Sequence, residues 1–529
     1  MPNLLGGARR GRRPAAGNQD LFRTSRRLLA PVGALSILLL STAHAAKWEI
    51  VPSITVGETY SDNIALTSDA TKRSDWVSQV TPGLTVAGTG ADLRFNASYT
   101  PYYNYYARGS GNDDFFQRGH ALGNLQLADH LLFLDFGGSI DQYDVLLGGP
   151  LTTSTVNTTG NRATVGTYFA SPYLRHDFGS QMQLEVRLTE SVVDTDGVES
   201  LPDSRSDHVE LHAKNGPAYK LFTWNVDYSR ENIDYRGDQD NSVIETTTAT
   251  GKRLVTSSLG LIAQAGYETY TMGEFLPDSK GAMWSAGFEW IPSPVTRLKA
   301  TAGHRFYGAA YLLEFSHRTR LTTWGIDYHE IVTTSRSEFL VTAGTTTSSY
   351  LDTLFSAQFP DPAARKRAVD EFIARTGLPP TLGSETNFLN SQLFLTKRLQ
   401  ASTGWLGSKN VVLLNVFREN RETLIGNEVV QFAGDFSNNS SIVQTGVGGQ
   451  WNFRLSQRDS WNTGASYSRN DFTGTTRRDT LFYLGMGLTR QFQPKLYGSV
   501  NYRRQQNDSN EDGFDYTENA VFANITMRF

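Results

Sequence analysis

Histidine offers the widest range of chemistry in this sequence, because an imidazole can bind a metal, transfer a proton or activate a nucleophile. Nine histidines are present and cysteine is absent, which excludes thiolate metal sites and cysteine nucleophiles. The sequence contains no H-E-x-x-H pair, G-x-S-x-G elbow or glycine-rich phosphate loop. His208 and His212 lie four residues apart, which in a strand separates them by about 13 Å and favours polar residues of the lumen or rim over a metal site. We therefore expect neither an enzyme nor a resident cofactor.

The best candidate for an ion site is formed by Asp508, Asn510 and Asp512. Oxygen ligands at positions 1, 3 and 5, followed by Gly513 at position 6, match the first half of an EF-hand calcium loop. Position 12 is Asn519 instead of glutamate, and no flanking helix is expected. The alternatives are a calcium-ordered loop and a solvated hairpin turn, and the sequence favours the turn.

Most of the chain consists of segments in which apolar and polar residues alternate, as in 93–106, 182–189, 222–229 and 496–503. Such a strand has one apolar face, which packs against a second sheet in water or faces lipid in a bilayer. Tyr and Trp occur near many strand ends, as in the aromatic girdles of outer-membrane barrels. The 39% hydrophobic content also fits, because only every second residue must be apolar. We predict an all-β fold, a large antiparallel transmembrane β-barrel and not a β-sandwich.

The polar faces of these strands supply candidate residues for the lumen of such a barrel. They combine aromatic rings with planar hydrogen-bonding groups, which are the groups that bind sugars, and their charges have both signs. Any water-filled barrel interior has similar properties, so the pattern alone does not define a sugar track. The lumen candidates are Arg94, Asn96, Tyr102, Glu185, Arg187, Asn225, Asp227, Tyr497 and Arg503.

The first 45 residues form a separate unit with a basic charge. They contain seven arginines and one acidic residue, a net charge of +6, so the whole-chain charge of −4 leaves −10 for residues 46–529. The mostly apolar stretch 28–40 and the sequence Ala43-His44-Ala45 complete the pattern of a cleavable secretory signal peptide. A membrane anchor is disfavoured, because 13 helical residues span only about 20 Å. We expect cleavage near Ala45 and a single barrel domain over 46–529.

The C-terminal segment alternates as far as the last residue. Phe529, Met527 and Ile525 are apolar, and polar residues separate them. A terminal aromatic residue on an alternating strand resembles the signal by which barrel assembly machinery recognises outer-membrane proteins. The alternative is an ordinary edge strand that ends in phenylalanine. Together with the signal peptide, this pattern predicts an integral protein of the bacterial outer membrane, in contact with its lipid and lipopolysaccharide but not with nucleic acid.

Connections between the predicted strands alternate in length. Short turns such as 128–130 and 493–495 alternate with longer polar stretches such as 62–74 and 144–163. This is the plan of short periplasmic turns and longer extracellular loops. The spacing predicts about 22 strands, within a range of 18–26.

One insertion, residues 334–385, breaks the strand pattern and falls on the extracellular side. Within it, 361–376 is predicted to be a helix, because Asp361 is a suitable N-cap, Pro362 follows, and Gly377 stands at the end. The helix either packs on the rim of the barrel or folds into the lumen as a gate. The candidate gate residues are Arg365, Arg367 and Phe372.

Several segments are similar to those of one bacterial family. The segments are 48–56 with 60–63, 314–324, 359–365, 387–389 and 397–400. Together they resemble the outer-membrane proteins associated with the PEP-CTERM/exosortase system, which are encoded alongside genes for exopolysaccharide synthesis and export. The resemblance implies a role in exopolysaccharide export or surface assembly, with exopolysaccharide and periplasmic export components as partners. It implies no catalytic residue. The alternatives are a general or oligosaccharide-specific porin for uptake, and a non-conducting envelope or biofilm scaffold.

Overall fold

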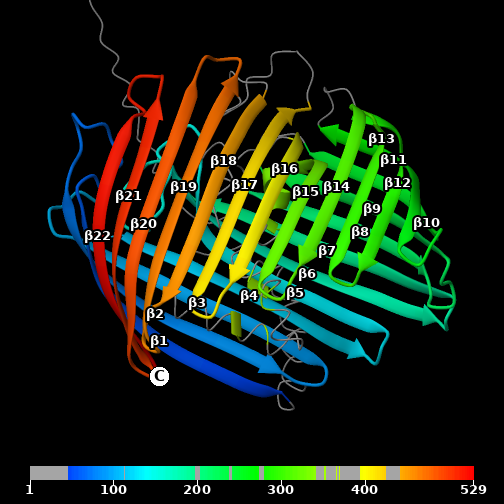
Figure 1. Cartoon of the computed structure of the whole chain (residues 1–529), viewed down its shortest axis with the longest axis horizontal. Coiled ribbons are helices and arrows are strands. Elements are labelled where there is room, and N and C mark those ends of the chain that lie inside the picture. The colour runs from blue at the N-terminus through cyan, green and yellow to red at the C-terminus, as the bar shows by residue number, and fades with distance from the viewer. Residues whose placement is uncertain are drawn as a thin grey trace, which may run out of the picture.

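The computed structural model of the chain contains a closed antiparallel β-barrel of 22 strands (Figure 1). It describes residues 46–111, 114–196, 203–236, 241–272, 279–340, 351–352, 355, 365, 368–369, 393–424 and 441–529. Each strand pairs with its neighbours in chain order, and β1 (Lys47–Ser61) closes the barrel by pairing with β22 (Tyr516–Arg528). The predicted fold class is therefore confirmed.

The strands between β1 and β22 have between 10 and 17 residues. They are β2 (Asp75–Thr89), β3 (Leu93–Tyr106), β4 (Asp114–Ala128), β5 (Leu132–Asp144), β6 (Arg162–Phe178), β7 (Met182–Asp196), β8 (Ser204–Asn215), β9 (Phe222–Tyr235), β10 (Ser242–Leu254), β11 (Leu259–Met272), β12 (Ser279–Ser293), β13 (Thr296–Arg305), β14 (Gly308–Arg318), β15 (Thr322–Thr334), β16 (Leu393–Leu406), β17 (Asn410–Thr423), β18 (Ser441–Arg454), β19 (Asp459–Thr473), β20 (Arg478–Gln493) and β21 (Leu496–Ser509).

The two ends of the barrel differ in the length of their connections. At the end where β1 begins and β22 ends, the strands are joined by two to six residues. Gly179 allows one of these tight turns, because its φ of 58° is easily adopted only by glycine. Most connections at the other end are longer, such as 62–74, 145–161 and 335–392, although β13 and β14 are joined there by only two residues. By the rule that periplasmic turns are short, the end with Lys47 and Phe529 faces the periplasm.

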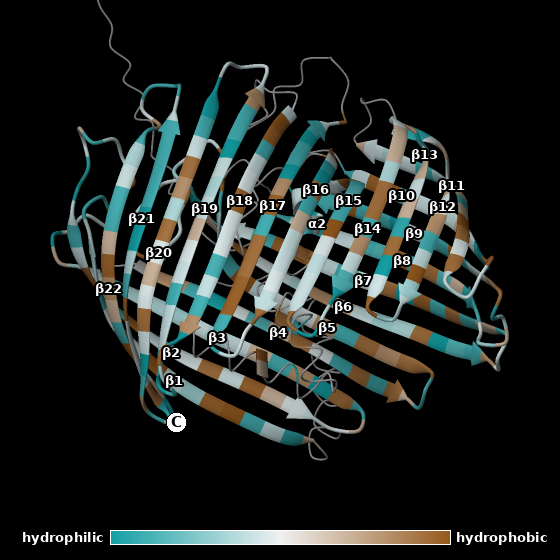
Figure 2. Cartoon of the chain, in the orientation of Figure 1, coloured by the Kyte–Doolittle hydropathy of each residue, from teal (hydrophilic) through white to brown (hydrophobic). Residues whose placement is uncertain are grey.

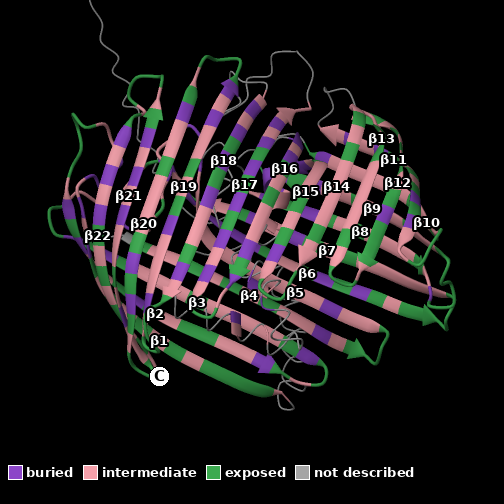
Figure 3. Cartoon of the chain, viewed as in Figure 1, coloured by how far each residue is buried: buried purple, intermediate pink, exposed green. Residues whose placement is uncertain are grey.

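Hydropathy and burial alternate along the strands (Figures 2 and 3), and many of the exposed strand residues are large and apolar, so the outer face of the barrel is apolar. Leu414 on β17 is 49% exposed, and Ile525 on β22 is 56% exposed. Trp405 and Trp451 lie near the periplasmic ends of their strands, whereas Tyr103 lies near an extracellular end. Aromatic girdles around an apolar band are the features of an integral outer-membrane β-barrel.

Helical structure is short in the described part of the chain. The helix α2 (Ser335–Leu340) directly follows β15, and no helix among the described residues is long and apolar enough to cross a membrane. Arg365, Ala368 and Val369, the described residues of the segment 361–376, are helical. The rest of that segment, including Arg367 and Phe372, lies outside the described residues, as does the predicted signal peptide over 1–45.

Candidate functional site

The helix α2 crosses the lumen near its extracellular end. Arg336 donates hydrogen bonds to Glu231 of β9 at 2.9 Å and to the side chain of Ser191 on β7 at 2.8 Å. On the other side of the helix, Glu338 forms an ion pair of 3.4 Å with Arg421 of β17. Seven strands separate β9 from β17, so only an element inside the barrel can contact both. These contacts also identify the polar strand faces as the inner ones.

An apolar side chain fixes the same helix. Phe339 is 2% exposed and contacts the ring of Tyr143 edge-on, with 4.7 Å between the ring centroids. Its other buried neighbours are Val145, Ala163, Val165 and Val193. The helix is therefore held by Phe339 and the partly buried Leu340, and by ion pairs that reach two walls of the barrel.

The connection 145–161 between β5 and β6 also folds into the barrel. Leu147 and Leu151 are buried against Phe394 of β16, Ile442 of β18 and Phe472 of β19. These strands belong to the opposite wall, because the barrel is closed and β16 lies ten strands beyond β6. The connection thus extends across the extracellular mouth, whereas the sequence had indicated only a polar extracellular loop.

The second half of this connection covers a buried ion pair. Asn157 donates a hydrogen bond of 2.8 Å to Glu518 of β22, and Glu518 pairs with Arg503 of β21 at 2.9 Å. Val156 packs beside them in a cluster that contains Tyr106 of β3. Arg503, a predicted lumen residue, therefore faces the lumen but is only 4% exposed.

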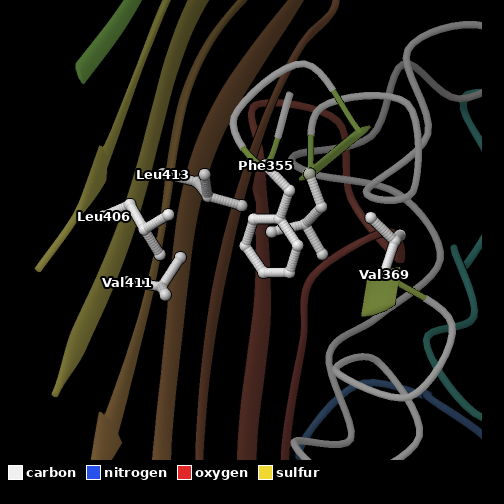
Figure 4. Packing of buried hydrophobic residues seen from close by; sticks show 6 residues of the cluster. Phe355, Val369, Leu406, Val411 and Leu413 are labelled. Atoms are coloured by element: carbon white, nitrogen blue, oxygen red, sulfur yellow. The ribbon is translucent and has the colours of Figure 1, made fainter. Parts of the chain in front are cut away.

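We call the described residues 351–352, 355, 365 and 368–369 between β15 and β16 the descending segment, and three of them reach the periplasmic end of the lumen. Its described residues Leu351, Phe355 and Val369 pack against Leu406, Val411 and Leu413 (Figure 4). Leu406 and Val411 flank the periplasmic turn 407–409 on the inner faces of β16 and β17.

Arg365, one of the three candidate gate residues, lies in this descending segment. Its guanidinium forms an ion pair of 2.8 Å with Asp352. Leu351, Phe355 and Val369 pack on the inner faces of β16 and β17, so the descending segment lies inside the barrel.

A cleft of about 680 Å³ opens on the opposite inner wall, at the periplasmic end of β6–β9. It contains three predicted lumen residues, Glu185, Asn225 and Asp227, and the predicted residue Arg187 lies beside it. Side chains of both charges surround the cleft. Its complete lining is Arg175, Gln183, Glu185, His212, Ala213, Lys214, Asn215, Thr223, Trp224, Asn225 and Asp227.

Glu185 is held between two arginines on one side of the cleft. Its carboxylate lies 2.6 Å from Arg175 and 3.1 Å from Arg187. Arg187 also pairs with Asp135 at 2.8 Å and lies over the ring of Tyr173, 3.9 Å from its centroid. These contacts fix two planar guanidinium groups and an aromatic ring in one orientation.

A second group of polar side chains lies on β8 and β9. His212 contacts the carboxylate of Asp227 at 2.9 Å, and Asn225 donates a hydrogen bond to the same carboxylate. Lys214 is exposed beside them. The sequence prediction missed Arg175 and Lys214, although Lys214 lies on the same strand face as His212, which was predicted to be a polar residue of the lumen or rim.

The other predicted lumen residues lie away from the cleft. Arg94, Asn96 and Tyr102 are on β3. The guanidinium carbon of Arg118, on the neighbouring strand β4, lies 5.9 Å from the centroid of the Tyr102 ring. Tyr497 is next to a periplasmic turn and donates a hydrogen bond of 3.1 Å to the carbonyl oxygen of Pro494. The sequence-predicted residues are therefore distributed over three separate parts of the inner wall.

The candidate calcium residues lie in the extracellular hairpin between β21 and β22. The Asp508 carboxylate accepts a hydrogen bond of 2.9 Å from Gln506. Asn510 accepts one from the Arg478 N–H at 2.7 Å and donates one to the Thr476 carbonyl at 2.6 Å, which ties this hairpin to its neighbour. Among the described residues, no group of three or more His, Cys, Asp or Glu side chains is arranged to hold a metal ion.

The candidate assembly residues lie on the outer face of the last strand. Phe529, Met527 and Ile525 are 55%, 44% and 56% exposed. The N–H of Phe529 donates a hydrogen bond of 2.9 Å to the carbonyl of Pro52 on β1. The terminal residue thus contributes to the junction that closes the barrel.

Comparison with known proteins adds a family for the C-terminal strands. Residues 428–529, which contain β18–β22, match the family "Putative beta-barrel porin 2". No curated protein sequence matches the chain. The siderophore receptor PirA from Acinetobacter baumannii has a TM-score of 0.45 and 10% identity, over 90% of this chain and 80% of that one. The outer-membrane protein opdK from Pseudomonas aeruginosa has a TM-score of 0.35 and 8% identity, over 91% of this chain and 99% of that one.

Proposed function

We propose that the protein is a gated outer-membrane conduit that exports an exopolysaccharide from the periplasm to the cell surface. The observation that carries this proposal is the cleft on β6–β9, which opens at the periplasmic end of a polar lumen. A glycan made inside the cell arrives at this end. A binding site at the periplasmic mouth therefore suits export better than uptake.

The groups around the cleft suit a saccharide. Asp227 and Glu185 accept hydrogen bonds from hydroxyl groups, whereas Lys214 and Asn225 donate them. The ring of Tyr173, fixed beneath Arg187, supplies an apolar face close to these polar groups. Charges of both signs disfavour a simple filter for anions or cations. The resemblance of the chain to exosortase-associated outer-membrane proteins supports exopolysaccharide as the saccharide.

The conduit is gated because elements of the chain itself occupy its interior. The helix α2 and the connection 145–161 are packed at the extracellular end, and Phe355 and Val369 are packed near the periplasmic end. Export of a long glycan along the barrel axis requires at least one of these elements to move. The same packed interior favours one competing function, a non-conducting scaffold that anchors an envelope complex.

Two measurements separate these functions. A deletion strain of the native host is complemented with the wild-type chain, with Asp227→Ala, or with Asp129→Ala, which alters a carboxylate that is 84% exposed in a periplasmic turn. We expect Asp227→Ala to reduce surface polysaccharide about tenfold at equal amounts of heat-modifiable barrel, and Asp129→Ala to have no effect. Unchanged surface polysaccharide in the deletion strain, with slower growth on an oligosaccharide, would reject export in favour of uptake.

Planar-bilayer recording tests the scaffold. The pure folded protein should give single-channel steps, which become more frequent when α2 is destabilised. A complete absence of steps for both the wild type and the destabilised variants would leave the scaffold as the remaining function.

A further inference from the structure

The barrel wall is incompletely paired between β14 and β15. The two strands form six residue pairs, which end at Leu313 and Tyr328. By comparison, β13 and β14 form ten pairs, and β15 and β16 form thirteen. Residues 308–312, the extracellular part of β14, therefore pair only with β13. Residues 329–334, the extracellular part of β15, pair only with β16. We call this unpaired part of the wall the β14–β15 seam.

The height of the seam follows from strand geometry. The six pairs start beside the periplasmic turn 319–321, and at about 3.3 Å per residue and a tilt of about 45° they rise about 14 Å. The apolar band of such barrels is about 25 Å tall. The seam thus begins near the middle of the membrane and lies at the level of the outer leaflet.

Unpaired backbone groups are unfavourable in lipid, and a side chain compensates for one of them here. Arg305, at the end of β13, donates a hydrogen bond of 3.2 Å to the backbone carbonyl of Glu330 on β15. The same guanidinium pairs with Glu268 at 2.5 Å and donates to the Tyr270 hydroxyl at 3.1 Å. A side-chain contact of this kind can be released without breaking a strand ladder.

The two sides of the seam differ in chemistry. On the lumen side, Glu268 and Arg305 form an ion pair. Beside this pair lie the aromatic rings of Tyr270 and Phe306, whose centroids are 5.3 Å apart. On the outer face, Ala309 is exposed and Tyr311 is 53% exposed. A molecule with a polar head and an apolar tail matches this arrangement, with the head in the lumen and the tail in the bilayer.

We propose that the β14–β15 seam is a lateral portal, through which a saccharide that carries an acyl chain passes between the lumen and the outer leaflet. The proposal rests on the export function stated above and names an acylated glycan as its substrate class. It accounts for the closed extracellular mouth, where α2 and the connection 145–161 occupy the axial route. A substrate that leaves sideways does not need to displace them.

Cysteine cross-linking can test the portal directly, because the chain contains no cysteine. The seam pair is Ala310→Cys with Ile331→Cys, which would face each other if the ladder continued. The control pair is Ser316→Cys with Gly325→Cys, which are partners in the paired part of the same two strands. We expect mild oxidation to join the control pair, and the seam pair to require a longer bismaleimide. Equally fast disulfide formation in the seam pair would show a closed wall and overturn the proposal.

Transport is then measured in proteoliposomes that contain a fluorescent acylated glucoside as the probe. Bridging the seam pair should slow transfer of this probe into the outer leaflet at least tenfold, whereas bridging the control pair should have no effect. Arg305→Gln should speed transfer several-fold, because it removes the guanidinium that holds Glu330. Transfer that is unaffected by bridging the seam would refute the portal. If bridging the seam pair has no effect while Asp227→Ala still reduces surface polysaccharide, the export function stands and only the lateral route is rejected.

Discussion

Replacement of Arg336 by methionine tests whether α2 closes the lumen. Arg336 is 2% exposed and donates hydrogen bonds to Glu231, Ser191 and Ser204 on three neighbouring strands. Methionine has a similar length and keeps the apolar contacts of the side-chain stem. It removes the charge that ties the helix to the wall formed by β7–β9. We expect Arg336→Met to shift the equilibrium from a latched helix to a released one.

The size of the shift follows from the burial of the pair. Removing one partner of a buried ion pair costs about 3–5 kcal/mol, because the other charge remains buried and unpaired. The side chain of Glu231 is 16% exposed and regains some hydration, so the lower limit of about 3 kcal/mol applies. At about 1.4 kcal/mol per factor of ten, the latched state loses about 150-fold in population. A channel that is open about 0.1% of the time would then be open about 13% of the time.

Single-channel recording of the pure protein measures this open probability. Arg320→Met is the matched control, because Arg320 lies exposed in a periplasmic turn. Glu231→Gln should raise the open probability as well, and the double variant should open little more than either single variant, because both act on one contact. If Arg336→Met folds normally, as judged by heat modifiability, and yet opens no more often than Arg320→Met, then α2 is not the latch.

Three further predictions concern other parts of the molecule. Burial raises the pKa of Glu338 above its ordinary value of 4.5, so the latched state binds this proton more tightly than the released state. The attachment of α2 should be strongest below pH 4.5 and weaken as the pH rises through the raised pKa, so the open probability of the channel should increase with pH. Glu338→Gln should flatten this increase. Deleting Phe529 should reduce the heat-modifiable barrel in the outer membrane, and normal amounts would contradict its role in assembly. Val369→Asp should detach the descending segment from Leu413 and increase conductance, whereas Val369→Leu should not, and equal conductance of both variants would count against an obstructing segment.

The strands could be predicted from the sequence because their signal is local. In a barrel strand every second side chain faces lipid, so the pattern in 496–503 alone separates the outer face from the inner one. The strand number followed from counting such segments and their turns. The tilt and pairing that close β1 onto β22 did not need to be known for this count.

The contents of the lumen could not be predicted, because their positions depend on contacts between distant parts of the chain. Leu147 and Leu151 lie in a stretch that reads as a polar extracellular loop, and their partner Phe394 is more than 240 residues away. The apolar residues within that loop were the available signal for inward folding. The helix α2 has six residues, too few for a clear periodicity.

The cleft was predicted in part for a related reason. Alternation assigns Glu185, Asn225 and Asp227 to inner faces, but it does not reveal that β6–β9 bring them together at one height. His212 joins them because its strand register sets it opposite Asp227. Register is a property of strand pairs, so a single strand cannot disclose such a cluster.

The attachment of the interior elements indicates which of them moves first. The connection 145–161 is buried against β16, β18 and β19 through apolar side chains and against β22 through Asn157, so its release would expose several hydrophobic clusters. The helix α2 packs only Phe339 and the partly buried Leu340 against one hydrophobic cluster and is also held by ion pairs, which a bound substrate can replace with its own polar groups. Its partner Glu231 lies on β9, the strand that also carries Asp227 of the cleft. A saccharide bound at the periplasmic end therefore occupies the wall to which the latch is fastened, and α2 is the element whose position it can bias.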